Sequence, residues 1–358
     1  MLQALYALAA LTAAVLPAAA ETLCNATNLC PKAYPCCSEY GYCQKGAFCL
    51  GGCNPLNSFR LESCMPAPVC ESHTNNFATD LSLVLLNHTQ YDGNATKWDW
   101  VVDKGEIVPN PEGDGVRLTL TKDAGGTRIS STRYVHYGKM EFVMTESSKW
   151  GGIITSAITM SDVKDEIDWE WVGAANDEVQ SNYFFLGIAD YVNTKGKTHK
   201  VEGGKASEEW HTYTLDWQEE ELKWLIDGKV VRTLKKSETV TADGQYQYPT
   251  TPSRVQLAIW ASGIEGTAEG TVQWGGGMVD WEAEDYTSNG YYWAELKTIT
   301  LECADEGLNT THGYVYTGID SANIPVSVAP KSFSPRSFAA DLCQANKQRA
   351  PFLRTFVE

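Results

Sequence analysis

Apolar and polar residues alternate in short runs through most of the chain between residues 76 and 303, and turn residues separate these runs. Alternation with a period of two is typical of a β-strand that packs one face against a core. Asp227 and Gly228 lie between two such runs, which is a strong signal for a β-hairpin. Because long helical periodicity is absent, the pattern predicts an all-β sandwich. Strands are expected at residues 115–120, 137–145, 150–160, 211–217, 222–226, 229–233, 254–260 and 293–301.

One expected strand has an acidic face. In residues 165–173, Glu166, Asp168 and Glu170 are spaced two apart, so their side chains share one face, whereas isoleucine and tryptophan share the other. The apolar face belongs against the core, which leaves the acidic row facing a cleft or solvent. Like charges in a row repel, and folding alone gives no reason for them. A solvated strand face and a calcium site are the alternatives to a catalytic row, and the tryptophans opposite make the solvated face a poor explanation.

Two of these carboxylates suit retaining glycosidic bond cleavage, which needs a nucleophile and a proton donor roughly 5–5.5 Å apart. The α carbons of Glu166 and Glu170 are expected to lie about 13 Å apart on a strand. Two long side chains that lean toward each other can close most of this gap. Asp168 lies between them, and it is expected to hydrogen-bond one glutamate and to keep the two pKa values apart.

The run from Glu166 to Glu170 resembles the active-site signature of glycoside hydrolase family 16, a family of retaining enzymes with a β-jelly-roll fold. The resemblance implies that Glu166 is the nucleophile, that Asp168 assists it and that Glu170 is the acid/base. Residues 133–141 and 210–228 resemble other parts of the same family. Residues 259–281 are similar to a narrower group, the fungal Crh cell-wall transglycosylases, which link chitin to β-glucan. The resemblance covers roughly residues 24–303.

Candidate sugar-binding residues lie near the end of this region. Gln256 and Trp260 share one strand face with a small alanine that leaves room for a sugar. Trp260 and Thr271 stand where Crh-type enzymes contact chitin, and Gln256 is expected beside them. Trp274 is a similar candidate, because the three glycines after it allow a ligand to approach closely. The alternative is that the two tryptophans belong to the core.

Eleven cysteines are distributed unevenly, with nine between Cys24 and Cys70 and only Cys303 and Cys343 beyond. A segment as short as residues 24–53 cannot bury much apolar surface, so disulfides are expected to hold it together. A metal site is the alternative, but the adjacent Cys36 and Cys37 and the lack of histidine among the cysteines argue against it. The odd total leaves one thiol unassigned.

Residues 36–53 closely resemble hevein-type chitin-binding modules of carbohydrate-binding module family 18. Three aromatic side chains offer stacking surfaces and a hydroxyl can fix an N-acetyl group, although a purely structural cap is the alternative. A further bridge is left open among Cys53, Cys64 and Cys70. The resemblance implies the disulfides Cys24–Cys37, Cys30–Cys43 and Cys36–Cys49, and a binding face of Ser38, Tyr40, Tyr42 and Phe48, in which Phe48 replaces the commoner tyrosine.

The composition indicates which class of partner the protein binds and in which compartment it is found. The net charge of −17 argues against nucleic acid, whose phosphates need basic patches, and suits an uncharged polysaccharide such as chitin or β-glucan. Residues 2–17 are apolar and precede three alanines, which predicts a secretory signal peptide rather than a membrane span. We therefore expect a secreted protein of the extracellular cell wall with no transmembrane segment in the mature chain. Four glycosylation sequons begin at Asn25, Asn87, Asn94 and Asn309.

The expected organisation has five parts. A signal peptide (1–20) precedes the hevein-like module (21–54), and a linker or wrapped arm (55–75) leads to the β-jelly-roll catalytic domain (76–303). The last part, residues 304–358, is expected to be an extension that is partly disordered or wrapped on the domain. The chain ends without the apolar tail that a lipid anchor replaces, so it is either freely secreted or incomplete.

The predicted function is a retaining transglycosylase that cleaves chitin and transfers the glycosyl unit to a β-glucan or chitin acceptor. No cofactor is expected, because an acid and a nucleophile supply the chemistry. No metal is assigned to the site, since the few histidines are scattered, and a structural calcium ion on the sandwich is left open. One alternative keeps the fold and uses water as acceptor, which gives an endo-acting chitinase or β-1,3-glucanase. The other is an inactive chitin-binding lectin, which the intact carboxylate row argues against.

Overall fold

A computed structural model describes residues 22–147, 149–190, 193–305, 312–320 and 325–332 of the chain. The expected signal peptide, the sequon at Asn309 and Cys343 lie outside the described residues. Within the described ranges, no helix is both long and apolar enough to cross a membrane.

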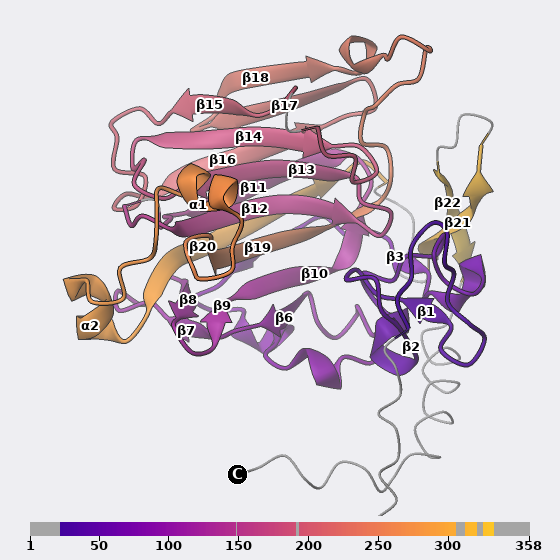
Figure 1. The fold of residues 1–358 in the computed structure, drawn as a ribbon, viewed down its shortest axis with the longest axis horizontal. Helices are drawn as coiled ribbons and strands as arrows, with labels where there is room; N and C mark the ends of the chain where they lie inside the picture. Colours follow the sequence, from indigo (N-terminus) through magenta and orange to yellow (C-terminus); the bar gives the residue numbers. More distant parts are fainter. Residues whose placement is uncertain (1–21, 148, 191–192, 306–311, 321–324, 333–358) are drawn as a thin grey trace, which may run out of the picture.

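Two sheets stacked on one another form the body of the protein, which confirms the expected all-β sandwich (Figure 1). The first sheet has eight strands in the order β15-β14-β13-β12-β19-β10-β6-β5. All neighbours in it are antiparallel except β5 and β6. Its strands are β5 (Val84–Leu85), β6 (Trp100–Lys104), β10 (Arg128–Val135), β12 (Ile153–Ser161), β13 (Glu166–Val172), β14 (Glu178–Phe184), β15 (Lys197–Lys200) and β19 (Ser253–Ala261).

The second sheet has nine strands, with the path β18-β17-β16-β11-β20-β8-β7 and two side pairings, β4 with β20 and β9 with β8. The hairpin expected around Asp227 and Gly228 joins β17 to β18. The strands are β4 (His73–Asn76), β7 (Ile107–Pro109), β8 (Val116–Thr121), β9 (Gly125–Gly126), β11 (Gly138–Met144), β16 (His211–Trp217), β17 (Glu221–Ile226), β18 (Lys229–Lys235) and β20 (Tyr292–Cys303).

Helices are few and short in the described residues. The α-helices α1 (Glu269–Trp274) and α2 (Glu284–Asn289) have six residues each. Six residues make less than two helical turns, so the sequence carries no period from which they could be predicted. The remaining short segments are the 3₁₀ helices η1 (Gly46–Cys49), η2 (Leu61–Ser63), η3 (Leu81–Leu83), η4 (His88–Gln90) and η5 (Lys236–Thr239).

The core between the two sheets is rich in tryptophan, and β13 supplies two of these residues. Trp169 and Trp171 are fully buried, and the ring of Trp171 stands at 83° to that of Tyr213 with centroids 4.6 Å apart. Buried indole N–H groups need an acceptor. The Trp169 indole donates to the Thr214 carbonyl at 3.3 Å, and the Trp224 indole donates to the Asp168 carbonyl at 3.0 Å. These bonds to the second sheet fix β13 in the first sheet with its apolar face toward the core.

Disulfides hold the N-terminal module, which we define as residues 22–54. The structure contains Cys24–Cys37, Cys30–Cys43 and Cys36–Cys49, the three pairs that the hevein resemblance implies. A fourth bond, Cys53–Cys64, settles which cysteine pairs with Cys53. Two short strands, β1 (Cys36–Cys37) and β2 (Cys43–Gln44), pair inside the module.

The segment after the module is an arm that packs on the sandwich. Strand β3 (Ala67–Pro68) pairs with β21 (His312–Ile319), which in turn pairs with β22 (Pro325–Ser332). Strand β4 adds to β20, and Cys70 is bonded to Cys303. Residues near both ends of the described chain therefore lie side by side, to the right of the sandwich in Figure 1.

The Cys70–Cys303 bond closes a loop with a sequence separation of 233 residues, against 11 for Cys53–Cys64. Loop-closure entropy predicts about 5 kcal/mol of stabilisation for the long loop and about 3 kcal/mol for the short one. Replacing Cys70 and Cys303 by alanine should therefore lower the free energy of unfolding more than the matched Cys53→Ala, Cys64→Ala double variant does. Urea unfolding of both proteins measures the difference. Equal unfolding free energies in wild type and the Cys70 double variant would contradict the estimate.

Candidate active site

The acidic row lies on the outer face of the eight-stranded sheet, the face that points away from the other sheet. Asp168 is 1% exposed, and Glu166 and Glu170 are half-buried. Ile167 and the two tryptophans of β13 belong to the core on the opposite face. The predicted alternation along this strand is therefore confirmed.

The strands beside β13 place small side chains in line with Glu170. Reading across the sheet, Glu170 is opposite Ser156, Ser156 is opposite Ala258, and Ala258 is opposite Arg128. Residues directly opposite on neighbouring strands share a face. Because serine and alanine are short, a band of small side chains separates Glu170 from Arg128 on the outer face.

Burial changes the acidity of all three carboxyl groups. Burial raises the pKa of Glu166 to about 7, an effect that the side chain of Asp168 and the charge of Lys164 partly oppose. Burial and the charge of Glu166 raise the pKa of Glu170 to about 7. Burial, together with the charges of both glutamates, raises the pKa of Asp168 well above its usual range. At neutral pH the row therefore holds protons that exposed carboxylates would have lost.

Asp168 is paired with Glu166, as expected. No hydrogen bond of ordinary length and angle joins the two carboxyl groups, but they lie close enough for their contact to lower the pKa of Glu166 and to raise that of Asp168. Asp168 is also held through its backbone, whose carbonyl accepts the Trp224 indole. Burial and the neighbouring glutamate charges favour the neutral form of the Asp168 carboxyl group, which agrees with the direction of its pKa.

The two candidate tryptophans come together at one end of the row. Trp274, from α1, donates its indole N–H to the Gln180 side chain at 3.0 Å, and Gln180 is opposite Glu170 in the sheet. The Trp260 and Trp274 ring centroids lie 6.1 Å apart with planes at 31°. Both side chains are half-buried and lie outside the core cluster. The structure thus brings an aromatic pair next to Glu170.

The other two cleft candidates differ in their surroundings. Gln256 is buried on the outer face, opposite Ile158, and its amide nitrogen has no partner among the described residues. Thr271 is half-buried on α1, where its carbonyl accepts the Gly275 N–H at 2.9 Å. Among the described residues, no side-chain hydrogen bond joins Thr271 to the acidic row.

The glycines after Trp274 have a different role from the one expected. Gly275 and Gly276 bring backbone segments together rather than leaving space for a ligand, whereas a Cβ on Gly277 would meet nothing within 4 Å. A Cβ on Gly275 would lie 1.8 Å from the Ser262 hydroxyl, and one on Gly276, whose φ is +85°, would lie 2.4 Å from the Gly173 carbonyl. Gly152 donates to the Gly275 carbonyl at 2.7 Å. The close contact fixes the end of α1 against the ends of β12 and β13.

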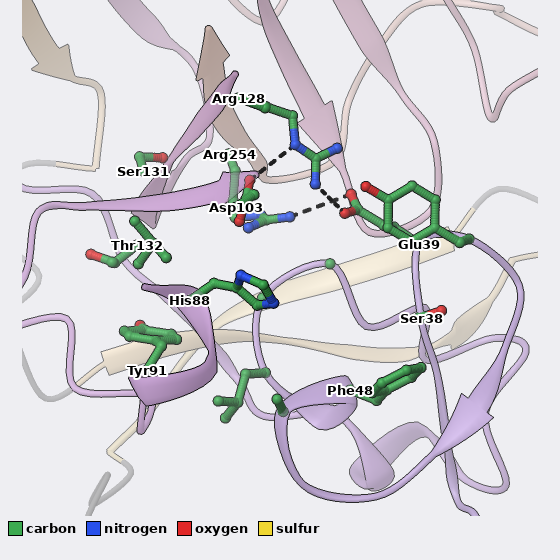
Figure 2. A pocket seen from close by; sticks show the side chains of 16 residues that line it. Ser38, Glu39, Phe48, His88, Tyr91, Asp103, Arg128, Ser131, Thr132 and Arg254 are labelled. Carbon is green, nitrogen blue, oxygen red and sulfur yellow. Dashed lines mark hydrogen bonds and ion pairs between the residues drawn. The ribbon is translucent and has the colours of Figure 1, made fainter. Parts of the chain in front are cut away.

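Sequence reasoning missed the contact between the N-terminal module and the outer face. Glu39 forms ion pairs with Arg128 and Arg254, the latter at 3.6 Å (Figure 2). Its backbone carbonyl accepts a hydrogen bond from the Lys164 ammonium group at 3.0 Å. Burial opposes the ionisation of Glu39, but the two arginines hold its pKa below the usual value. No local motif announces this contact, because the partners are far apart in the sequence.

A backbone contact completes the junction. The Gly52 N–H donates to the Tyr134 hydroxyl and to an Asp162 oxygen, both at 3.1 Å. Gly52 has φ of +81°, and a Cβ there would meet the Arg254 guanidinium at 2.8 Å. Glycine is therefore required where the module approaches Arg254.

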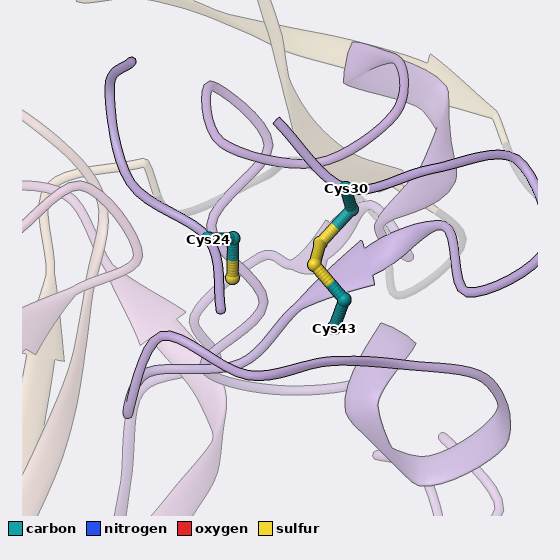
Figure 3. A group of neighbouring side chains, drawn as sticks. All are labelled: Cys24, Cys30 and Cys43. Carbon is teal, nitrogen blue, oxygen red and sulfur yellow. A yellow bond between two sulfur atoms is a disulfide. The ribbon is translucent and has the colours of Figure 1, made fainter. Parts of the chain in front are cut away.

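One group of cysteine sulfurs in the described part of the chain is compact enough to suggest a metal site, formed by Cys24, Cys30 and Cys43 (Figure 3). Cys30 is bonded to Cys43 and Cys24 to Cys37. A cysteine must be a thiolate to bind a metal ion, so these disulfide-bonded sulfurs are not available for coordination.

A β-sandwich with a buried carboxylate row and a tryptophan pair on one open face is the architecture of a carbohydrate-active enzyme. Residues 94–276 match the family described as glycosyl hydrolases family 16, and the chain belongs to that family.

Two relatives and one solved structure show which members of the family this chain is similar to. Crh-like protein 2 of Aspergillus fumigatus is 42% identical over 284 residues, which cover 78% of this chain and 62% of the relative. Congo red hypersensitive protein 2 of Saccharomyces cerevisiae is 39% identical over 303 residues, which cover 83% and 63%. A solved structure described as Crh5 transglycosylase in complex with NAG has a TM-score of 0.59 and 30% identity, over 76% of this chain and 96% of that one. The chain spans about three-fifths of the length of the curated relatives it matches.

The coupling between the two glutamates can be measured directly. Glu166→Gln removes the negative charge that helps to raise the pKa of Glu170, so that pKa should fall from about 7. It should stay above 4.5, because burial is unchanged. Carboxyl carbon NMR of protein labelled at glutamate measures the titration, with the exposed Glu302→Gln on the other sheet as control. An unchanged pKa of Glu170 would mean that the two carboxyl groups do not interact.

Proposed function

We propose that this protein is a retaining transglycosylase of the fungal cell wall, which cleaves chitin and transfers the glycosyl unit to a β-glucan or chitin acceptor. The observation that carries the proposal is the row of Glu166, Asp168 and Glu170 on the outer face of a family 16 sandwich. The similarity to Crh-like proteins and to a solved Crh5 transglycosylase with bound NAG supports the reaction and the donor.

In the first half of the reaction, a Glu166 carboxylate oxygen attacks the anomeric carbon of the donor sugar. The bond from that carbon to the glycosidic oxygen breaks, and Glu170 gives its proton to the departing oxygen. Because both glutamates have a pKa of about 7, the reactive form, in which Glu170 keeps its proton and Glu166 has lost its own, is populated around neutral pH. The products are a glycosyl ester on Glu166 and a shortened chain with a new hydroxyl end.

In the second half, the Glu170 carboxylate takes the proton of an acceptor hydroxyl as its oxygen attacks the anomeric carbon. The ester bond to Glu166 breaks, and the carboxylate is restored. Asp168 acts as a positioning residue beside Glu166. Because its raised pKa keeps it protonated, it can donate a hydrogen bond to the carboxylate that Glu166 becomes.

Transfer requires that a sugar outcompetes water for the glycosyl ester. A bound and oriented acceptor can reach effective molarities of roughly 10⁵ M or more, whereas a mobile one cannot. Trp260 and Trp274 offer the aromatic surface nearest to Glu170 on which a sugar ring can stack. Gln256, with its unpartnered amide, and Thr271 complete the set of proposed substrate contacts.

The N-terminal module is proposed to bind chitin through Ser38, Tyr40, Tyr42 and Phe48. Tyr40 is 66% exposed, and Tyr42 and Phe48 are also exposed, so their rings are open to a ligand. The Ser38 hydroxyl accepts the Tyr42 N–H at 3.2 Å, which leaves its own proton free to donate.

The catalytic assignment predicts two variants with different substrate dependence. Glu166→Gln should abolish cleavage and transfer, because no glycosyl ester can form, and it should leave folding and chitin binding intact. Glu170→Gln should be equally damaging with natural chitin oligomers and milder with a donor whose leaving group needs no proton. Product analysis and circular dichroism measure these effects. Full activity in Glu166→Gln would remove the nucleophile assignment.

The module assignment predicts a binding defect. Replacing Tyr40 and Tyr42 by alanine should weaken binding to insoluble chitin about tenfold or more, since each stacking ring contributes on the order of 1 kcal/mol. Pull-down isotherms on chitin particles measure this. The matched control is Leu29→Ala, another exposed residue of the module outside the proposed face. Equal binding by all three proteins would mean that the module is a structural cap.

If Trp260 and Trp274 form the surface on which the acceptor sugar stacks, removing one of them should change the ratio of transfer to hydrolysis. Trp274→Ala should lower the ratio of transfer to hydrolysis products at fixed acceptor concentration, because water needs no platform. Chromatography of the products measures the ratio. If the ratio does not change, the acceptor binds elsewhere on the outer face.

A further inference from the structure

A cavity of about 270 Å³ lies at the junction between the N-terminal module and the eight-stranded sheet (Figure 2). Tyr40 and Phe48 line it from the module, and His88 and Tyr91 line it from the segment around η4. Arg128 and Arg254 of the outer face complete its wall. The cavity thus combines the proposed chitin-binding face of the module with side chains that belong to the sandwich.

We propose that this cavity is a sugar subsite shared by the two parts of the protein, and that it joins the module and the catalytic row into one binding track for a single chitin chain. The inference rests on the proposed function and extends it, because it gives the sandwich a part in chitin recognition by the module.

The charges at the cavity favour a neutral ligand. Glu39 and Asp103 are matched by Arg128 and Arg254, and these four groups pair with one another. A ligand with a net charge would meet no unpaired opposite charge among them. An uncharged sugar avoids that penalty and can stack on the aromatic residues of the wall.

Two polar atoms of the wall are buried without partners among the described residues. They are the Tyr91 hydroxyl and the Arg254 Nε. A buried polar group without a hydrogen bond is costly, and both atoms belong to side chains that line the cavity, so a ligand hydroxyl or N-acetyl group that reaches them would supply the missing hydrogen bond. Tyr91 lies outside the module, in a segment that sequence reasoning did not single out.

The register of the sheet relates the wall of the cavity to the acidic row. Arg128 ends the band of small side chains that begins at Glu170, and Arg254 is opposite Met160, which is opposite Glu166. Strands lie about 4.8 Å apart, so the three steps from β13 to β10 span roughly 14 Å. A chain of a few sugar units can therefore reach from the carboxylates to the cavity.

The junction is rigid enough to hold such a track. Glu39 bridges two arginines from different strands, and Gly52 is hydrogen-bonded to Tyr134 and Asp162. Rigid placement of two binding surfaces lets one chain occupy both without a second loss of translational freedom.

The test is calorimetric titration of chitin oligomers of two and of six or more units into full-length Glu166→Gln protein, which binds without turnover. Tyr91→Phe in this background should weaken binding of the long oligomer about three- to tenfold, the loss expected for one hydrogen bond to a neutral group. Tyr246→Phe, an exposed tyrosine that does not line the cavity, is the matched control and should not change the affinity. The long oligomer should bind with one chain per protein.

A second variant approaches the cavity from the opposite wall. Ala47 is exposed and lines the cavity, so Ala47→Trp fills it without disturbing a core. It should weaken binding of the long oligomer by at least as much as Tyr91→Phe does. Wild-type affinity in both variants would overturn the proposal, and so would two long chains bound per protein. A β-1,3-glucan oligomer whose binding depends equally on Tyr91 would overturn the choice of chitin. Absence of turnover by the wild-type enzyme would instead refute the proposed function and leave these binding results interpretable.

Discussion

Strand β13 has to bury its apolar face in the core although this also buries the carboxyl groups on its other face. The large area of its apolar side chains makes the arrangement stable. Burial of one tryptophan removes roughly 200 Å² from water and contributes on the order of 5 kcal/mol. Raising the pKa of a glutamate to about 7 costs on the order of 3 kcal/mol once the group is ionised. Burial of Trp169 and Trp171 therefore holds the apolar face of the strand against the core. The free energy it provides exceeds the cost of burying the carboxyl groups on the other face. Their raised pKa values follow from this arrangement.

The same logic governs the junction between the module and the sandwich. Arg128 and Arg254 occupy the outer face of the sheet, where they would be exposed if the module were absent. Glu39 neutralises them in a largely buried setting, and removing one partner of such a set usually costs more than the set contributes. The module is thereby held over one side of the open face, at the end of the band of small side chains that leads from Glu170 to Arg128.

Local patterns were sufficient for much of this picture. Alternation located residues 211–217 as a strand with the observed bounds, and the acidic row follows from the two-residue period of β13. Features that depend on distant residues could not be read in this way. Cys70 and Cys303 are 233 positions apart, and Glu39 meets an arginine 89 residues away. For the glycines after Trp274, the sequence predicted correctly that something approaches the backbone closely but not what approaches it. At Gly276 the close neighbour is the backbone of Gly173 and not a ligand.

The central claim is that a sugar, not water, resolves the glycosyl ester on Glu166. The most direct measurement incubates the protein with chitin oligomers and a fluorescently labelled β-1,3- or β-1,6-glucan oligosaccharide, and analyses the labelled products by mass spectrometry. The account predicts labelled hybrids that are longer than the acceptor by N-acetylglucosamine units. Shortened chitin oligomers without any labelled hybrid, at saturating acceptor, would contradict it and identify the enzyme as a hydrolase.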